Sequence, residues 1–189
     1  MNLALEYARD LIKYYEGFES KPYQDVASHW TVGYGFTMIG DQKVSETFPS
    51  SITEAKAGDL LDKLLLDLKH EVLTHVRSEE WITSARLGAL LSFTYNVGIG
   101  NLIQSGITDL LRSNLAHVAA SKITNYVWAG NRVYQGLADR RLAEKHLFEY
   151  EEFQLYHRGK KIDTPSEDDH FSPVHSPKDA PRIKKGNSL

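Results

Sequence analysis

The sequence of 189 residues contains no cysteine and only two methionines. Without cysteine the chain cannot form a disulfide, and it has no thiolate to act as a nucleophile or a metal ligand. This composition is typical of a protein that folds in a reducing compartment. Any catalytic chemistry therefore has to use carboxyl, imidazole, hydroxyl or amine groups.

Long hydrophobic runs are also missing. No stretch approaches the roughly 20 consecutive apolar residues that a membrane-spanning helix needs. The first residues, MNLALEYARDLIKYYEGF, are interrupted by the charged side chains of Glu6, Arg9, Asp10 and Lys13. A secretory signal starts with a basic segment followed by an apolar run, so we expect neither a signal peptide nor insertion into a membrane.

A cluster of basic residues dense enough to indicate nucleic-acid binding is absent as well. The formal net charge is -3, but it is unevenly distributed. Residues 1–82 carry 8 Lys+Arg and 14 Asp+Glu, which gives -6, whereas residues 83–148 carry 7 and 3, which gives +4. The basic region predicts either ordinary solvated faces or a surface that meets an anionic partner.

Motifs of several other enzyme classes cannot be found. The GYG at 33–35 and the GIG at 98–100 lack the flanking residues of a phosphate-binding loop. His70 and His75 are five positions apart, so they do not share a helix face as the histidines of an HExxH zinc motif would. No GxSxG nucleophile elbow is present.

Helical periodicity dominates what is present. Apolar residues recur at three- and four-residue steps over 3–15, and a longer apolar stripe predicts a helix over about 52–76. Ser51 and Glu54 are a candidate capping box for this second helix, which would be about 37 Å long and able to connect two lobes. Further helices are expected over the following ranges: 83–97, capped by Thr83; 109–114, capped by Ser105 or Thr108; 115–127; and 137–153.

Residues 22–37 alternate between apolar and polar positions around a turn at 26–29, which predicts a hairpin. We therefore expect an α+β fold that is mostly helical and has two lobes. A small hairpin lobe (about 16–51), the connecting helix (52–76) and a helical lobe (77–156, with the N-terminal helix) would form one domain over 1–156.

The composition changes near residue 157. Residues 157–189 hold four of the six prolines and a single aromatic residue. Such a segment buries too little apolar surface to offset the entropy lost on ordering, so we predict a disordered tail. A plain solvated tail is the simplest interpretation, with a linker, an address or a partner-binding segment as the alternative.

Residues 16–37, EGFESKPYQDVASHWTVGYGFT, contain two candidate catalytic acids. Glu16 ends the first helix one turn after the apolar Ile12, and partial burial would raise its pKa, as a general acid requires. Asp25 lies at the head of the hairpin, where backbone N–H groups would keep it ionised. A solvated helix end and a turn aspartate are the simpler explanations for these two positions.

Strand periodicity assigns the residues after Asp25 to two faces. Trp30, Val32, Tyr34 and Phe36 would lie on an apolar face, and Thr31, Gly33, Gly35 and Thr37 on the other. A hydroxyl beside a carboxylate can hold a water molecule, and glycine lets a bulky ligand approach the backbone. We therefore interpret Thr31 as a water-holding residue and Gly33 and Gly35 as substrate contacts, with a bulge or kink as the alternative for the glycines.

The motif E-G-x(4)-P-Y-x-D-x(5)-T-x-G-Y-G resembles the phage-type lysozymes of glycoside hydrolase family 24. SFTYNVGIGNL at 92–102, ITDLLRSN at 107–114 and WAGNRVYQGLADRRLAE at 128–144 are similar to later segments of that family. The resemblance covers about residues 3–150. Two positions depart from it, because many relatives have glycine at the position of Ser28 and histidine at that of Phe36.

The resemblance implies a muramidase that cleaves the β-1,4 bond between N-acetylmuramic acid and N-acetylglucosamine in peptidoglycan, with inversion and without a metal or cofactor. It implies that Glu16 is the general acid and that Asp25 and Thr31 position the attacking water. Inversion predicts that the two carboxyl groups lie about 6.5–9.5 Å apart.

Four further residues are candidates for substrate binding within this family. Tyr95 and Asn96 would line the cleft opposite the hairpin, with core packing and a helix C-cap as the alternatives. Arg140 and Arg141 would contact glycan or peptide-stem carboxylates, although a role in buttressing a helix is the favoured interpretation.

The resemblance also suggests a biological setting. The commonest one is a phage or prophage endolysin, made in the host bacterial cytoplasm and released to the cell wall through a holin. A phage tail component or an injected antibacterial effector would have the same catalytic core. A non-catalytic cell-wall-binding protein, a chitinase and a transglycosylase are the rival functions. We expect a monomer whose partner is peptidoglycan.

Overall fold

The computed structural model describes residues 2–25, 28–48, 51–76, 82–129 and 132–162. Its helices are α1 (Leu3–Glu16), α2 (Glu54–Val76), α3 (Ser84–Val97), α4 (Ile99–Gln104), α5 (Ile107–Arg112), α6 (Ala116–Ile123) and α7 (Gln135–Tyr150). Its strands pair as antiparallel hairpins: β1 (Glu19–Gln24) with β2 (Trp30–Gly33), β3 (Met38–Ile39) with β4 (Gln42–Lys43), β5 (Trp128–Ala129) with β6 (Arg132–Val133), and β7 (Leu155–His157) with β8 (Lys160–Ile162).

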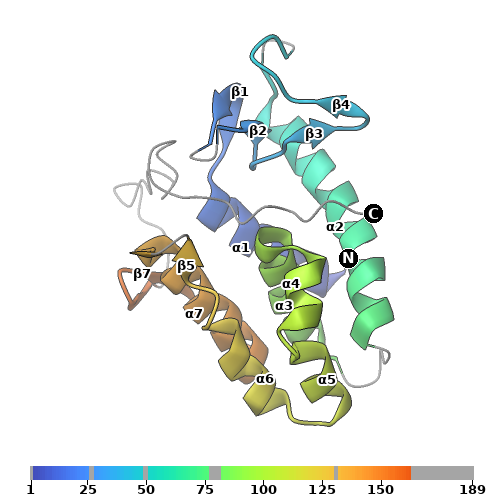
Figure 1. Ribbon diagram of the computed structural model, residues 1–189, viewed down its shortest axis with the longest axis vertical. Coiled ribbons are helices and arrows are strands. Elements are labelled where there is room, and N and C mark those ends of the chain that lie inside the picture. The colour runs from blue at the N-terminus through green and yellow to red at the C-terminus, as the bar shows by residue number, and fades with distance from the viewer. Residues whose placement is uncertain (1, 26–27, 49–50, 77–81, 130–131, 163–189) are drawn as a thin grey trace.

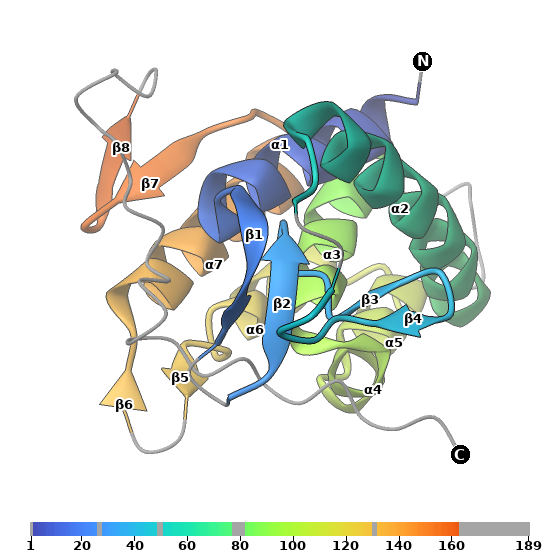
Figure 2. The ribbon, with the colours of Figure 1, turned by 90° about the horizontal axis from the view of Figure 1, so that it is seen from above.

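The fold is mostly helical and has two lobes, as the sequence predicted. Figure 1 shows β1 to β4 at one end, the bundle of α3 to α7 at the other, and α2 extending from the strands alongside the bundle. Figure 2, seen from above, shows the strands lying over the helices. With 23 residues, α2 is about 34 Å long. None of the described helices is long and apolar enough to cross a membrane.

The cap of α2 differs from the prediction. Thr53, rather than Ser51, accepts a hydrogen bond from a backbone N–H of the first turn, that of Lys56, at 3.2 Å. Glu54 does not close a capping box with Ser51, because its Oε1 accepts a hydrogen bond from the hydroxyl of Tyr34 at 2.9 Å. The first turn of α2 therefore connects this helix to the small lobe.

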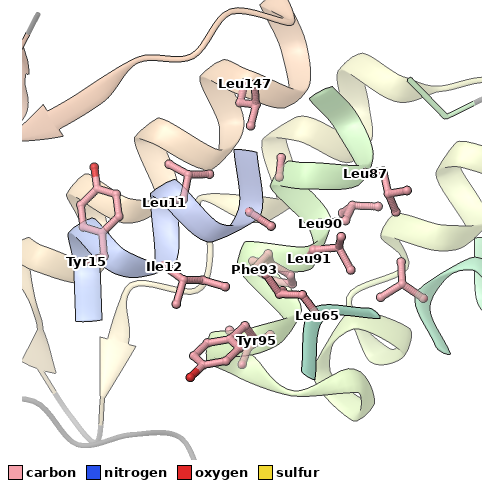
Figure 3. Close-up of a cluster of buried hydrophobic side chains, with 14 of the residues drawn as sticks. Leu11, Ile12, Tyr15, Leu65, Leu87, Leu90, Leu91, Phe93, Tyr95 and Leu147 are labelled. Atoms are coloured by element: carbon pink, nitrogen blue, oxygen red, sulfur yellow. The ribbon is translucent and has the colours of Figure 1, made fainter. Parts of the chain in front are cut away.

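The core is built around α3, which is buried along nearly its whole length. Leu11 and Ile12 of α1 and Leu147 of α7 pack with Leu90 and Phe93 of α3 in one apolar cluster (Figure 3). The predicted bounds of α3 are confirmed. The side chain of Thr83 caps its start, and Gly98, with a φ of 87°, ends it.

Several short elements were not predicted. Helix α4 and the β3–β4 and β5–β6 hairpins have six residues or fewer per element, too few for a hydrophobic period to be recognised. Helix α6 ends at Ile123, four residues before the predicted end. The residue before α5 is Gly106, and the hydroxyl of Ser105 accepts a hydrogen bond from Ile107 N at 3.1 Å.

The C-terminal β7–β8 hairpin corrects the predicted start of the tail. Residues 157–162 are part of the fold, because Asp139 of α7 accepts hydrogen bonds from the backbone N–H groups of Arg158 (2.8 Å) and Gly159 (2.7 Å). The hydroxyl of Tyr15 lies 3.1 Å from both the N and the O of Tyr156. The remainder of the predicted tail, 163–189, lies outside the described residues.

The β1–β2 turn contains a strained residue. Ser28 has a φ of 60°, a left-handed conformation that disfavours any residue with a Cβ. The turn is fixed by hydrogen bonds from Ser28 N to Asp25 O (2.8 Å) and from Asp25 N to His29 O (2.9 Å). The turn geometry therefore favours glycine at this position.

Replacing Asp139 with asparagine should loosen the C-terminal hairpin. The carboxylate, which is 2% exposed, also accepts a hydrogen bond from Gln135 Nε2 at 3.0 Å, and one amide oxygen cannot replace all these bonds. We expect a loss of about 1–3 kcal/mol in the free energy of unfolding, measured with urea. Amide exchange should quicken at Arg158 and Gly159. Unchanged exchange would contradict this, and Lys160→Ala on the same hairpin is the control.

Replacing Ser28 with glycine should stabilise the protein. Glycine removes the left-handed strain, partly offset by its greater freedom in the unfolded chain, so we expect a gain of up to about 1 kcal/mol in urea unfolding. Ser121→Gly is the matched control, because Ser121 lies in α6 and glycine should destabilise a helix there by about 0.5 kcal/mol relative to serine. If Ser28→Gly and Ser121→Gly change the free energy of unfolding in the same direction, the strain proposed for the turn is refuted.

Candidate active site

Glu16 is the last residue of α1 and is only 3% exposed. The helix ends because Gly17 has a φ of 65°, while its N–H still donates to Lys13 O at 3.1 Å. The chain then turns directly into β1. The prediction that this carboxyl group lies at the helix end and is desolvated is confirmed. A solvated helix end is therefore excluded.

An arginine from the other end of the chain holds Glu16. Arg140 Nη1 of α7 lies 2.8 Å from Glu16 Oε1, and both side chains are buried. The other edges of the guanidinium are also bonded: Nε donates to Glu144 Oε1 at 3.0 Å and Nη2 to Ser92 O at 2.9 Å. Burial alone would lower the pKa of Arg140, but the carboxylates of Glu16 and Glu144 outweigh it and raise that pKa.

A second buried arginine completes the cluster. Arg141 Nε lies 2.8 Å from Glu144 Oε2, and its guanidinium lies over the ring of Phe93 at 5.0 Å. Burial lowers the pKa of Arg141 to about 10, although Glu144 acts in the opposite direction. Its Nη1 finds no hydrogen-bond partner among the described residues.

Arg140 and Arg141 were candidate substrate contacts, and the structure corrects this. They are 1% and 0% exposed, respectively, so neither guanidinium is at the surface to meet a glycan or a peptide stem. They support the interior of the protein, in agreement with the alternative interpretation. Two of the seven basic residues of 83–148 are therefore buried and do not contribute to a surface that could bind an anionic partner.

Asp25 lies at the head of the β1–β2 hairpin and is 8% exposed. Its Oδ1 accepts a hydrogen bond from the backbone N of His29 at 2.8 Å, and His29 Nδ1 lies 3.6 Å from the same oxygen. The predicted backbone support for Asp25 is therefore present.

Thr31 is fully buried and pairs with Tyr23 across the hairpin. Its hydroxyl donates to Tyr23 O at 3.2 Å, which uses its only proton. The oxygen can still accept a hydrogen bond from a water molecule. The β1–β2 hairpin thus holds Asp25 and Thr31 on adjoining parts of one small structure.

The interpretation of Gly33 and Gly35 as one bare strand face is wrong. β2 ends at Gly33, and the chain then turns so that Val32 and Phe36 bond to each other through their backbones. Gly33 and Gly35 have φ values of 66° and 88°. A Cβ at Gly33 would lie 2.8 Å from the Phe36 ring, so this glycine is required by the turn and by packing. The alternative interpretation of the two glycines, a bulge or kink in the strand, agrees better with their positive φ values.

Tyr95 also has a structural position. It is 5% exposed, and its hydroxyl donates to Tyr34 O at 2.8 Å, which joins α3 to the turn after β2. This contact agrees with the alternative of core packing. Asn96 is partly exposed, and the predicted C-cap role falls instead to Gly98, whose N–H donates to Thr94 O at 2.8 Å.

Ser92 and Glu144 are the residues of this cluster that were given no role from the sequence. Ser92 Oγ donates to Glu144 Oε1 at 2.7 Å, and both are fully buried. The spacing of Arg140 and Arg141 to Glu144, four and three residues, was the signal that could have shown the ion pairs. No such signal exists for Ser92, which comes from another helix. No group of three or more metal-binding side chains occurs in the described part of the chain.

Comparison with known proteins adds independent information. The family model described as phage lysozyme matches residues 13–144. The endolysin of Bacillus phage PZA is 32% identical over 142 residues, covering 74% of this chain and 52% of that protein. The SAR-endolysin of Bacteriophage PS119 is 32% identical over 132 residues, covering 70% of this chain and 75% of that protein. The chain spans about half the length of the first of these relatives.

The solved structures agree on the fold. The endolysin from Escherichia coli O157:H7 phage FAHEc1 superposes with a TM-score of 0.69 at 24% identity, covering 78% of this chain and 93% of that one. The matched residues 13–144 include Glu16, Asp25, Thr31 and the buried cluster on α7. The chain belongs to the phage lysozyme family.

Proposed function

We propose that this protein is a lysozyme that hydrolyses the β-1,4 bond between N-acetylmuramic acid and N-acetylglucosamine in bacterial peptidoglycan, with inversion and without a cofactor. The proposal rests mainly on the position of Glu16, whose carboxyl group is buried at the end of α1 and bound by Arg140. A second, hydrogen-bonded carboxylate, Asp25, follows within the next hairpin. Two acids in different surroundings are what glycoside hydrolysis requires.

Glu16 would act as the general acid. Arg140 fixes the orientation of the carboxyl group by binding Oε1, so the proton to be donated would reside on Oε2. The proton would move to the glycosidic oxygen as its bond to the anomeric carbon breaks. Burial keeps bulk water away from this proton, because Glu16 is 3% exposed.

Asp25 and Thr31 would hold the attacking water. The carboxylate of Asp25 accepts one proton of the water and acts as the general base, while Thr31 Oγ1 accepts the other hydrogen. The water attacks the anomeric carbon on the face opposite the leaving oxygen, which inverts the configuration. This geometry predicts about 6.5–9.5 Å between the carboxyl groups of Glu16 and Asp25.

Glu16→Gln should abolish lysis while keeping the fold. The amide fills the same space and can still accept a hydrogen bond from Arg140, but it has no proton to donate. We expect turnover of purified peptidoglycan, measured as new reducing ends, to fall by about 10²–10⁴-fold. Glu19→Gln, an exposed acid three residues away, is the control and should keep wild-type activity. A fully active Glu16→Gln would overturn the proposal.

Asp25→Asn should lower turnover by at least about 100-fold, because the amide is a poor base. The backbone bond from His29 can persist, so the midpoint of thermal unfolding should change little. The stereochemical course is the decisive measurement. The wild-type enzyme should release the α-anomer from the β-linked glycan, observed by proton NMR at early times, and release of the β-anomer would exclude the water-holding role.

Product analysis separates the rival functions. A transglycosylase would leave 1,6-anhydro ends instead of reducing ends, and a chitinase would cleave chitin. A cell-wall-binding protein without activity would sediment with peptidoglycan and release no ends from it. The intact set of Glu16, Asp25 and Thr31 favours hydrolysis, because a binding protein has no need for a buried, paired acid.

The biological role that fits this activity is lysis of a bacterial host by a phage or prophage. We propose a monomeric endolysin that is made in the host cytoplasm and reaches peptidoglycan through a holin-dependent release. Support comes from the names of the relatives, which are endolysins and SAR-endolysins of phages. A phage tail component or an injected effector would share the site. Lysis of permeabilised but not intact cells would favour a released endolysin.

A further inference from the structure

The carboxylate of Glu144 is the centre of the buried cluster behind Glu16. Its Oε1 accepts hydrogen bonds from Ser92 Oγ (2.7 Å), Arg140 Nε (3.0 Å) and Arg141 Nη2 (3.1 Å). Its Oε2 lies 2.8 Å from Arg141 Nε. This carboxylate is fully buried, and the catalytic scheme proposed above does not use it.

The guanidinium of Arg140 binds two carboxylates at the same time. Nη1 binds Glu16 and Nε binds Glu144, so the guanidinium cannot move toward either without losing the other. Nη2 is held by the carbonyl oxygen of Ser92 at 2.9 Å and by its hydroxyl at 3.3 Å. Glu144 and Ser92 thus fix the nitrogen that Arg140 presents to Glu16.

The sharing of Arg140 by two carboxylates affects whether Glu16 is protonated, and a general acid must be protonated to act. An arginine bound to a carboxyl group in a dry site strongly favours the ionised form, and that form cannot donate a proton. A second carboxylate on the same guanidinium weakens this attraction and also repels a charge on Glu16. Arg141, bound to Glu144 on the other side, acts in the opposite direction.

We propose that Glu144 is a positioning residue that acts through Arg140 to keep Glu16 protonated in the working pH range, with Arg141 as its opposing charge. The inference rests on the proposed role of Glu16 as general acid. It assigns a function to the last acid of the RRxxE segment, 140–144. A purely structural Glu144 would support the helix packing without affecting the proton on Glu16.

Few other titratable groups act on this cluster. Glu16, Glu144 and Tyr15 are those that act electrostatically on the two arginines. Helix α3 contributes Ser92, which does not titrate. The elements that pack here carry further titratable side chains: Glu6, Tyr7, Arg9, Asp10, Lys13 and Tyr14 of α1, Arg86 and Tyr95 of α3, Asp139, Lys145, His146, Glu149 and Tyr150 of α7, and Tyr156 and His157 of β7.

Burial displaces the pKa of several of these neighbours. Burial raises the pKa of Tyr15 and of Tyr156 above the ordinary tyrosine value. Burial also lowers the pKa of His146, so this imidazole changes charge only in a more acidic range. A shift of the alkaline side of the activity profile in a Glu144 or Arg141 variant is assigned to Glu16 by direct titration of its carboxyl carbon.

Two substitutions should move the pH profile of peptidoglycan turnover in opposite directions. Glu144→Gln removes the competing charge, so the alkaline limb of kcat/KM should move about one pH unit lower. Arg141→Met removes the opposing cation, so the limb should move higher by a similar amount. Methionine fills the space over Phe93, but Glu144 Oε2 loses its ion pair with Arg141 Nε, so we expect this variant to fold with lower stability than the wild type.

Two more variants serve as controls. Glu144→Asp keeps the charge and should retain the wild-type limb, even if the protein is less stable. Tyr126→Phe removes the hydroxyl that donates to Asn101 O at 3.2 Å but keeps the ring that packs on Phe93, so it should leave the limb unmoved. Unshifted limbs in both Glu144→Gln and Arg141→Met would overturn the proposal. If Glu144→Gln does not fold, Arg141→Met alone decides.

A measurement without turnover separates this proposal from the proposed function. The carboxyl carbon of Glu16, labelled with ¹³C and assigned by comparison with Glu16→Gln, can be titrated by NMR in each variant. Its midpoint should fall in Glu144→Gln and rise in Arg141→Met, whether or not the protein cleaves peptidoglycan. Shifted midpoints with no turnover would refute the function alone, and turnover with fixed midpoints would refute the role of Glu144.

Discussion

The ion pair between Glu16 and Arg140 joins α1 to α7 across 124 positions of the chain. Glu16 ends α1, Arg140 lies on α7, and Ser92 of α3 binds the same guanidinium, so one cation connects the three helices that form the core. A buried ion pair is favourable when further hydrogen bonds satisfy its donors and acceptors, as the three bonded nitrogens of Arg140 are, because desolvation of an unpaired charge is strongly unfavourable. The guanidinium that orients Glu16 is therefore also a structural centre, and this contact cannot loosen without disturbing the core.

The small lobe is attached by a second set of contacts centred on Tyr34. Its hydroxyl donates to Glu54 at the start of α2, and its carbonyl oxygen accepts from Tyr95 of α3. The Nζ of Lys13 lies over its ring at 5.3 Å, which adds a contact with α1. The Gly-Tyr-Gly sequence at 33–35 thus forms a junction: two left-handed glycines turn the chain so that the tyrosine between them reaches three helices.

Much of the fold could be predicted because long helices have a hydrophobic period that survives in the sequence. The bounds of α1 and α3 follow from that period and from the Thr83 cap. Glu16 and Asp25 could be singled out because one ends a helix and the other heads a hairpin. Gly33 and Gly35 could not be interpreted from alternation alone, since their role is set by φ and by the Phe36 ring. Arg140 and Arg141 were uncertain for a similar reason: a sequence gives the charge of a side chain but not its burial, which here depends on residues 48 and more positions away.

The contacts of α1 with the β7–β8 hairpin and with α7 have a consequence for folding during synthesis. Tyr15 bonds to the backbone of Tyr156, 141 positions along the chain, and Glu16 bonds to Arg140, 124 positions along. Contacts of such sequence separation form late, because they must wait for the intervening chain and for its loop closure. During synthesis, α1 leaves the ribosome with its acid exposed and no arginine to orient it. Glu16 can pair with Arg140 only after α7 has emerged, so a nascent or prematurely terminated chain carries this carboxyl group without the arginine that orients it.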